Sequence, residues 1–466
     1  MSARSTAIAL CFVALGIWAL ADLARMGNDL PWRVMYDFQD FYCAGDALDR
    51  GESPYTYEPL RTCEHRLNGS RIFAENPAFA VPAPQPPFDF LPFMALAKLN
   101  LGLVRELYAS FIVVAVALTA IVLWRLSIPF DVALAALVLP AGFVELAAGQ
   151  IVPFALLALV LTGWMLAEQR DWLAGIFAAL TAIEPHLGAG VVLAVLLFAP
   201  RARAAAIVTA LLLIAAGAGV AGLGTGTVYL THVLPAQATA EIPFPYQYSL
   251  TYALHNLGAG DAVALGLGTL SFIVALLAAL WLAPKTAAAL GRRELLVFLP
   301  AASAVIAGAY VHMVELCFAI PAALVFARWG RGALQVIAVA ALCLLAVPWI
   351  IAWSVKKLFL ASIFVCALLV YRLRVPSAAG IAIVAAIAAA LYLLELRPPV
   401  LPVPVVSPVA AAALVQSEWQ TFVRTLDTHD PLWLTVKLPT WCALAALFII
   451  ASALGRRANH APVPKT

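Results

Sequence analysis

The sequence predicts an all-α membrane protein: a polytopic transmembrane helical bundle that forms a single integral membrane domain over residues 1–466. Hydrophobic residues make up 64% of the chain and charged residues only 11%. Soluble domains carry about 25% charged residues, so this much apolar surface needs lipid as its solvent. Apolar runs recur along the chain, and Lys and Arg collect in alternate short connections. These observations predict about 12–14 spans.

The spans follow from the apolar runs, because a helix that crosses about 30 Å of hydrocarbon needs about 20 apolar residues. The first run follows the amino terminus, and we expect it to be a retained signal anchor rather than a cleaved signal peptide. Two runs, 172–183 and 187–200, are short, which is tolerated where neighbouring helices or a cavity satisfy the backbone. The expected spans are 5–23, 104–125, 128–146, 150–167, 172–183, 187–200, 203–223, 262–283, 294–310, 313–327, 333–353, 357–371, 377–395 and 437–454.

Lys and Arg in short loops predict the orientation. With the amino terminus inside, the carboxyl terminus is also cytoplasmic, and only Lys356 and Lys357 fall on a short external turn. The membrane is expected to be the inner or plasma membrane. Basic residues on the cytoplasmic turns are then Arg125, Arg170, Arg201, Arg203, Lys285, Arg292, Arg293, Arg328, Arg331, Arg372, Arg374, Arg456 and Arg457.

Three long polar segments are external in this topology: 24–103, 224–261 and 396–436. Within the first, residues 87–100 are apolar but short and bounded by prolines, which predicts a short helix lying in the interface. Cys43 and Cys63 also lie in the first segment. They can form a disulfide if the segment faces an oxidising compartment, although spacing alone does not decide this.

Several function classes are excluded. The chain has no P-loop, no HExxH and no CxxC motif. No basic tract is interleaved with aromatic residues, so nucleic acid is not an expected partner. We expect no cofactor, and no cluster of residues at metal-ligand spacing demands a metal.

Ionisable and amide side chains at membrane level gather on the external face. Such groups are costly near lipid and usually mark a pathway or a site. Each has a structural alternative: solvated loop carboxylates, a Glu-Pro helix boundary, or a pair one helical turn apart. Their convergence on one face nevertheless predicts a functional site there. The residues are Asp37, Asp40, Glu145, Gln150, Glu184, His186, His255, Tyr310, His312 and Glu315.

Aromatic residues crowd the first external segment. Their ring faces suit a sugar or a lipid, and the structural alternative is the interfacial aromatic belt of membrane proteins. The residues are Phe38, Phe41, Tyr42, Tyr55, Tyr57, Phe88 and Phe90.

The first external segment resembles that of glycosyltransferase family 87. The resemblance begins at residues 37–44 (DFQDFYCA) and 51–55 (GESPY). It continues in the family's order and covers about residues 35–330. The later matching elements are Pro86-Pro87-Phe88, Leu91-Pro92, Gly149-Gln150, Leu173-Ala174-Gly175, Glu184-Pro185, Tyr248-Ser249-Leu250 and His312.

The resemblance implies a GT-C architecture and a polyprenyl-phosphate sugar, such as mannose, as donor. Transfer to a hydroxyl of a glycan or glycolipid acceptor would occur at the extracytoplasmic face, with inversion and without a metal. Asp37 matches the family's first-loop Asp and is the expected general base, with Asp40 as the second choice. Other residues expected to bind donor or acceptor are Glu145, Gln150, Glu184, His186, His255, His312 and Tyr55, with Arg105 and Lys98 as further phosphate ligands.

One departure from the family leaves alternatives open. Many relatives have Lys-Pro where this chain has Glu184-Pro185-His186. A Lys suits a phosphate as a point charge, whereas here only His186 can supply a cation. A catalytically degenerate relative therefore remains an alternative. A lipid or solute transporter or flippase is another, and it predicts ionisable groups near the bilayer midplane.

Overall fold

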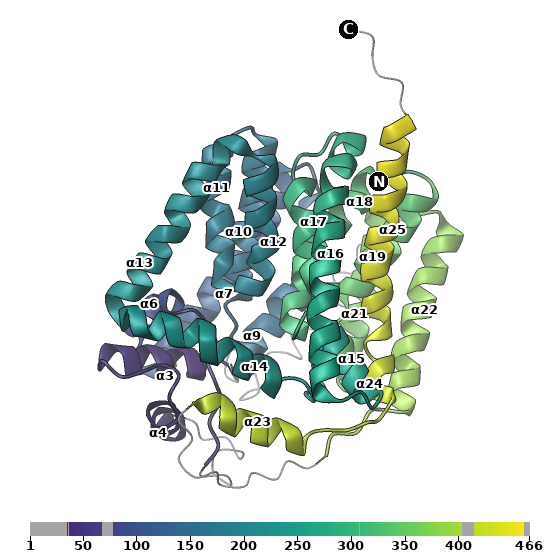
Figure 1. The fold of residues 1–466 in the computed structure, drawn as a ribbon. Coiled ribbons are helices and arrows are strands. Elements are labelled where there is room, and N and C mark those ends of the chain that lie inside the picture. Colours follow the sequence, from purple (N-terminus) through teal and green to yellow (C-terminus); the bar gives the residue numbers. More distant parts are fainter. Residues whose placement is uncertain (1–34, 36, 68–77, 307, 403–413, 461–466) are drawn as a thin grey trace.

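The computed structural model describes residues 35, 37–67, 78–306, 308–402 and 414–460. Helices dominate these ranges, and their β pairing is limited to the isolated bridges Thr56–Leu414 and Gln247–His312. The predicted all-α helical bundle is confirmed (Figure 1). The predicted span at 5–23 lies outside the described residues.

Six helical segments in the described ranges are long and apolar enough to cross a membrane. Two of them combine several elements, and in each of these two a π-helical turn joins the α-helices on either side of it. The six segments are α7 (Leu101–Arg125); α8 (Phe130–Leu137) with η3 (Val138–Phe143) and α9 (Val144–Ala148); α13 (Arg203–Val228) with η6 (Tyr229–Val233) and α14 (Leu234–Ala240); α16 (Asp261–Leu290); α22 (Ser377–Leu396); and α25 (Leu438–His460).

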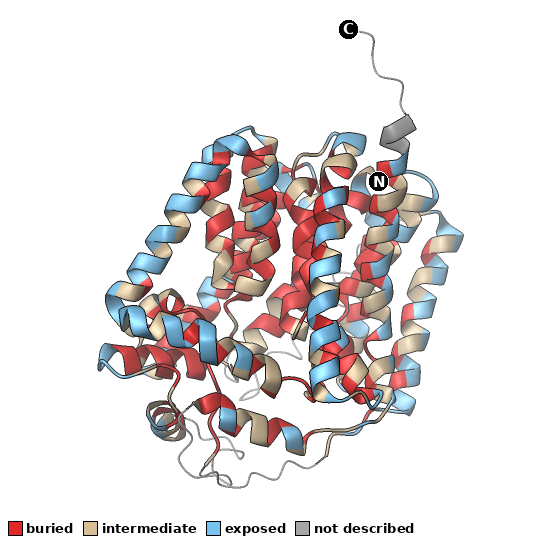
Figure 2. Ribbon diagram, viewed as in Figure 1, coloured by how far each residue is buried: buried red, intermediate tan, exposed pale blue. Residues whose placement is uncertain are grey.

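Shorter apolar helices complete the bundle. Figure 2 shows buried residues concentrated on the inner helices and exposed ones along the outer faces of α13 and α16. Exposed side chains on the outer helices are themselves apolar, as with Leu212 at 63% and Ile381 at 70% exposure, which suits contact with lipid. The shorter helices are α10 (Val152–Ala167), α11 (Asp171–Leu180), α12 (Pro185–Phe198), α17 (Leu295–Ile306), α18 (Ile320–Trp329), α19 (Ala333–Ala346), α20 (Trp349–Ala352) and α21 (Lys356–Arg372).

Short helices gather at one end of the bundle, the lower end in Figure 1. Prolines shape several of them: Pro87 begins the turn that leads into α6, in the segment predicted to be an interfacial helix. A disulfide joins Cys43, in the helix Phe38–Asp49, to Cys63, in the helix Tyr57–Leu67. Besides α14, the short helices are α3 (Phe38–Asp49), α4 (Tyr57–Leu67), η2 (Pro87–Asp89) with α6 (Phe90–Leu96), α15 (Leu250–Asn256), α23 (Val415–Thr425) and α24 (Leu432–Thr435).

Two predicted boundaries differ from the structure. The segment after residue 223, expected to be an external loop, is helical to Ala240; Gly222, with φ +81° and ψ 152°, interrupts the helix in a kink beside the expected end of the preceding span. The span expected at 313–327 begins instead with a 3₁₀ helix, η7 (Met313–Ala319), and becomes α-helical at Ile320. Both differences bring polar backbone and side chains to the end where the short helices lie.

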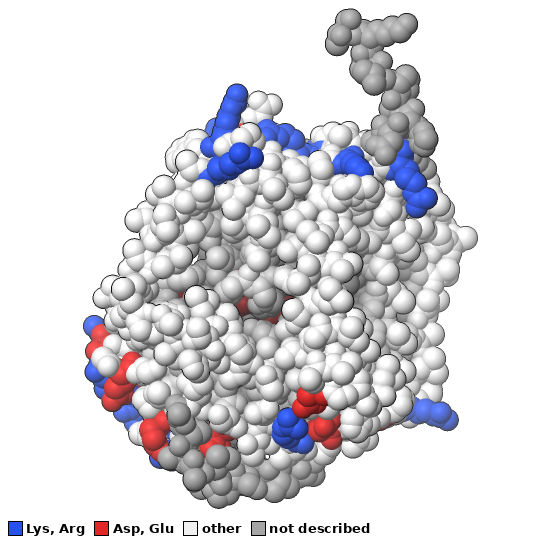
Figure 3. Space-filling model, in the orientation of Figure 1, with Lys and Arg blue, Asp and Glu red and all other residues white. Residues whose placement is uncertain are grey.

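Charged side chains divide between the two ends. Figure 3 shows Lys and Arg at the end of the bundle remote from the short helices, and Asp and Glu with further basic residues at the other. The flank between the ends is apolar. Figure 3 also shows a hollow in this flank, between α13 and α16, with acidic atoms visible inside.

Candidate functional site

A cavity of about 240 Å³ lies among the short helices. Segments far apart in the sequence line it: α3, residues 81–85, the starts of α10 and α12, α14 and the chain after it, η7 and α23. Its lining combines five carboxylates, two imidazoles and five aromatic rings, and the described residues that line it include neither Lys nor Arg. These residues are Asp37, Asp40, Glu184, Glu241 and Glu315; His186 and His312; and Phe41, Phe244, Tyr246, Tyr310 and Trp419.

Asp37 is positioned by the turn that follows α9. Its backbone N–H donates to the carbonyl of Ala148 at 2.8 Å, and Gln150 Nε2 donates to Asp37 Oδ2 at 2.6 Å. Gly149 stands between these two contacts with φ +76°. A Cβ on Gly149 would lie 2.7 Å from Phe38 Cβ, so only glycine permits this approach of α3 to the turn. The Gly149-Gln150 pair therefore fixes the Asp37 carboxylate.

Asp40 lies one turn along α3 in a different environment. The residue is 1% exposed, and neither carboxylate oxygen has a hydrogen-bond partner within the described ranges. Burial raises the pKa of Asp40 well above its usual value, and the charges of Glu64 and Asp37 raise it further. Burial also raises the pKa of Asp37, but the Gln150 hydrogen bond lowers it. Asp37 is therefore the carboxyl of the two that ionises more readily.

The two histidines are linked through carboxylates. Glu315 Oε2 lies 3.1 Å from His186 Nε2, and Glu315 Oε1 lies 3.6 Å from His312 Nδ1. His312 Nε2 is 3.1 Å from Glu241 Oε2. Burial by itself would lower the pKa of His312, but Glu241 and Glu315 outweigh it and hold this pKa well above its usual value. His312 is therefore a cation at neutral pH.

Three further side chains donate hydrogen bonds to the Glu241 carboxylate. Trp419 Nε1 donates to it at 2.6 Å, Gln237 Nε2 at 2.8 Å and Gln247 Nε2 at 3.1 Å. Because Trp419 belongs to α23, this hydrogen bond places the third long polar segment against the cavity. Sequence reasoning did not single out Glu241 or Trp419. The aromatic and proline-rich run 242–248 (IPFPYQY) after Glu241 was the available signal.

Glu184, which departs from the family's Lys-Pro pattern, lies between η4 (Thr181–Ile183) and α12. Burial raises the pKa of Glu184 to about 8, while nearby His186 lowers it and Glu315 raises it. The side chain is thus mainly a neutral acid at pH 7. Ligand atoms of Glu184, His186 and Glu315 lie within 4.8 Å of one another, so this trio is also the set in the cavity that could hold a metal ion.

Six of the nine residues predicted for catalysis or binding line this one cavity: Asp37, Asp40, Gln150, Glu184, His186 and His312.

Tyr55, Glu145 and His255 do not line it. The Tyr55 hydroxyl donates a hydrogen bond to the carbonyl of Gln85 at 2.6 Å, and the Tyr55 ring stacks on Tyr229. Tyr55 therefore packs behind the lining residue Gln85. Glu145 is fully buried within the Phe130–Ala148 segment. His255 lies at the end of α15 beside Asp427.

The two further phosphate ligands expected from the resemblance also lie elsewhere. Lys98 is 63% exposed and pairs with Asp49 at 2.9 Å, and Arg105 is on α7, outside the lining. Among the described lining residues, histidines are therefore the candidate cations of this cavity.

A second, apolar cavity of about 480 Å³ adjoins the polar one. The two share a wall, because Ile151 and Ile183 of the apolar lining directly follow Gln150 and directly precede Glu184 of the polar lining. Phe93 of the apolar lining also contacts Phe41 of the polar one, with ring centroids 5.4 Å apart. The remaining apolar lining residues are Phe88, Asp89, Pro92, Ala95, Leu96, Tyr108, Phe111, Phe154 and Leu213. An amphiphilic molecule can thus place its polar group and its apolar chain in adjoining cavities.

Residues 85–308 match the sequence model of glycosyltransferase family 87. A comparison with curated proteins finds no match. The matched segment includes Gln150, Glu184 and Glu241 of the polar cavity and most of the apolar one. The chain is a membrane protein with several apolar helices, and its residues 85–308 are similar to glycosyltransferase family 87, a family of GT-C type.

Proposed function

We propose that this chain transfers a sugar, mannose or a similar hexose, from a polyprenyl-phosphate donor to a hydroxyl of a glycan or glycolipid acceptor. The observation that carries the proposal is the pairing of a Gln-held carboxylate, Asp37, with an imidazolium, His312, in one cavity that adjoins an apolar one. The match to glycosyltransferase family 87 over residues 85–308 supports sugar transfer, and the adjoining polar and apolar cavities suit the two halves of such a donor.

Asp37 acts as the general base. It takes the proton from the acceptor hydroxyl as that oxygen attacks the anomeric carbon and the bond from this carbon to the phosphate oxygen breaks. A single displacement inverts the anomeric carbon. The leaving group is polyprenyl phosphate, already a stable anion, so no strong acid is needed. Asp40 is neutral when Asp37 is ionised and donates a hydrogen bond that positions the acceptor.

His312 and His186 receive the donor phosphate. Imidazolium N–H groups form charge-assisted hydrogen bonds to phosphate oxygens, and the carboxylate of Glu241 keeps His312 charged. Glu184, as a neutral acid, does not repel the phosphate and can donate to it. In this way, His186 takes the part of the family's Lys beside His312, and the transfer step needs no metal.

The reaction takes place at the extracytoplasmic face in this proposal. Stable disulfides form in oxidising compartments, and the Cys43–Cys63 bridge lies at the cavity end. Lys and Arg prevail at the other end, as the positive-inside rule requires of a cytoplasmic side (Figure 3). A transporter would instead place its polar residues near the bilayer midplane.

The test uses purified protein in lipid nanodiscs and a panel of polyprenyl-phosphate sugars, with released polyprenyl phosphate as the readout. We expect one sugar to be used when Mg²⁺ and Mn²⁺ are omitted. Asp37→Asn should lower turnover by about 10²–10⁴-fold, the usual contribution of a general base. Asp49→Asn, on the same helix but exposed, is the matched control and should keep full turnover. Near-normal turnover of the Asp37 variant would rule this base out.

A further inference from the structure

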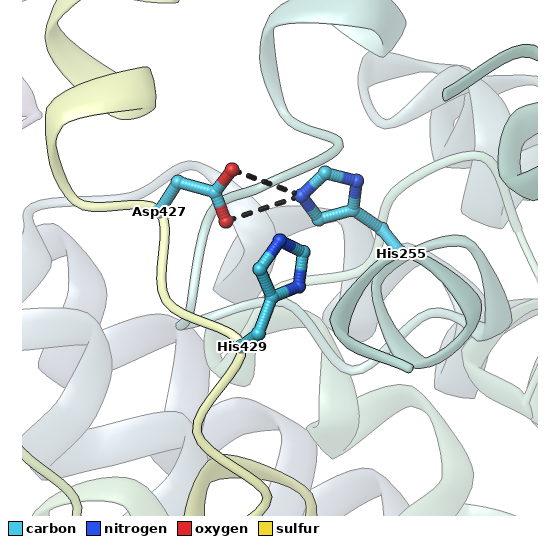
Figure 4. Close-up of side chains that lie close together, drawn as sticks. All are labelled: His255, Asp427 and His429. Atoms are coloured by element: carbon cyan, nitrogen blue, oxygen red, sulfur yellow. Dashed lines mark hydrogen bonds and ion pairs between the residues drawn. The ribbon is translucent and has the colours of Figure 1, made fainter. Parts of the chain in front are cut away.

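A second cluster of ligand-type side chains lies outside the catalytic cavity. His255 ends α15, while Asp427 and His429 follow α23 (Figure 4). His255 Nε2 lies 3.1 and 3.2 Å from the two carboxylate oxygens of Asp427. The rings of His255 and His429 are 5.3 Å apart, centroid to centroid. Two external segments that are distant in the sequence therefore meet at this cluster.

Its geometry fits a tetrahedral cation. Ligand atoms of the three residues all lie within 4.8 Å of one another. Zinc–nitrogen and zinc–oxygen bonds of about 2.0–2.2 Å place tetrahedral ligands roughly 3.3–3.6 Å apart, which is close to the 3.1–3.2 Å between His255 Nε2 and the Asp427 oxygens. His429 Nδ1 is 3.4 Å from the carbonyl of Asn256, which leaves Nε2 for a metal. Figure 4 shows a ring nitrogen of His429 turned toward the His255–Asp427 pair.

The surroundings supply the second layer of contacts that metal-binding histidines usually have. Asp261 Oδ1 lies 3.1 Å from His255 Nδ1, the nitrogen that does not face Asp427. Arg424 in turn donates to Asp261 Oδ2 at 3.0 Å. This contact is an ion-pair distance and not a hydrogen bond, because His255 Nδ1 has no hydrogen-bond partner within the described ranges. A carboxylate beside the far nitrogen of a ligating histidine favours a proton on that nitrogen and raises the basicity of the other one. His255 is thus oriented with Nε2 toward Asp427 and His429.

We propose that His255, Asp427 and His429 bind a divalent cation of the zinc class, with water in the fourth position. Two imidazoles and one carboxylate favour Zn²⁺ over Mg²⁺ or Ca²⁺, which prefer oxygen ligands alone. The cation fastens the carboxyl end of α23 to α15. Because α23 carries Trp419, whose indole donates to Glu241, the metal stabilises one wall of the cavity and takes no part in the transfer.

Metal content tests the site directly. The full chain, purified with a histidine-free affinity tag and dialysed against ZnCl₂ and then metal-free buffer, should retain one zinc per chain by mass spectrometry. His429→Ala and Asp427→Asn should lose it. Because His429 is exposed, its variant is expected to fold. His232→Ala, an exposed histidine on η6, is the matched control, and His186→Ala tests the other possible ligand set. Both should keep the zinc.

A stability measurement separates a built site from loose adsorption. After chelation, adding ZnCl₂ should raise the Tm of the wild-type chain and of His232→Ala, and leave the Tm of His429→Ala unchanged. Absence of retained zinc in the wild type would overturn the proposal. So would loss of zinc in His186→Ala together with its retention in His429→Ala, because the cation would then belong to the catalytic cavity. Neither readout depends on the sugar transfer.

Discussion

At the scale of single residues, the cavity separates two carboxyl groups that the sequence places only one helical turn apart. Asp37 accepts a hydrogen bond from Gln150, while Asp40 has none among the described residues and stands next to the charges of Glu64 and Asp37. A difference in environment is how proteins give two like acids different protonation states. Hence the pair can provide one base and one hydrogen-bond donor at the same pH.

The pH profile of transfer should report this arrangement. Activity requires Asp37 deprotonated, and burial raises its pKa, so the acid limb lies above the usual aspartate value. Gln150→Ala removes the hydrogen bond that lowers this pKa. The acid limb of kcat/KM should therefore move to higher pH, while the alkaline limb stays in place. An unchanged acid limb would mean that Asp37 is not the group that titrates.

Glu241 should control the alkaline limb of the pH profile of kcat/KM. Activity also requires protonated His312, whose pKa is raised well above its usual value against the effect of burial, first of all by Glu241. Glu241→Gln keeps much of the shape but removes this charge, so His312 loses its proton at lower pH and the alkaline limb should move down. The acid limb should move to lower pH by a smaller amount, because Glu241 makes the smallest contribution to the shift in the pKa of Asp37. A fixed alkaline limb would exclude His312 as the required cation.

At the scale of elements, the close approach of α3 to the turn after α9 decides where the base stands. Gly149→Ala would place a Cβ 2.7 Å from Phe38 Cβ at a residue with φ +76°. A left-handed backbone costs about 1–2 kcal/mol for a non-glycine residue, and overpacking about 1–3 kcal/mol. We expect a lower Tm and reduced turnover. Gly266→Ala, at an exposed helical site with open space, should be neutral or slightly stabilising.

The lengths of the hydrophobic runs predicted most helices of the bundle, and the differences between the predicted and the observed helices have physical causes. Each long apolar helix in the described ranges corresponds to an expected span. The kink at Gly222 lies beside the expected span end at residue 223, but the helical residues that follow it were expected to form a loop because that segment is too polar for a span. The 3₁₀ start of η7 depends on Glu315, whose carboxylate accepts from the backbone N–H of His312 at 3.1 Å. Apolar run length carries no information on such a contact.

At the scale of the whole molecule, topology explains which part of the site the sequence could predict. Alternation of spans placed Asp37, Gln150 and His312 on one face, and the structure brings them to one cavity. The same alternation placed His255 on that face, but the fold carries it to a separate cluster with Asp427. The alternation of spans thus predicts which residues share a face, whereas the position within that face depends on how α23 packs beside α14.

Two apolar cavities of about 480 Å³ each are candidate sites for the lipid chain of the proposed polyprenyl-phosphate donor. One adjoins the polar cavity through Ile151 and Ile183. The other lies between α16 and α25, lined by residues such as Ala278 and Phe448. Only the first shares a wall with the catalytic carboxylates, so a phosphate at His312 can extend its lipid tail there. We therefore expect the first cavity to set the affinity for long-chain donors.

Ala95→Phe and Ala278→Phe make the same substitution in the lining of the two cavities. Each methylene displaced from an apolar site costs about 0.8 kcal/mol, so losing two raises KM roughly tenfold. Ala95→Phe should raise KM for a long polyprenyl-phosphate sugar by about that factor, leave kcat unchanged, and have little effect on a donor with a short chain. Ala278→Phe should change neither constant. Since both variants add the same ring to an apolar surface, a reversed result would place the lipid tail between α16 and α25.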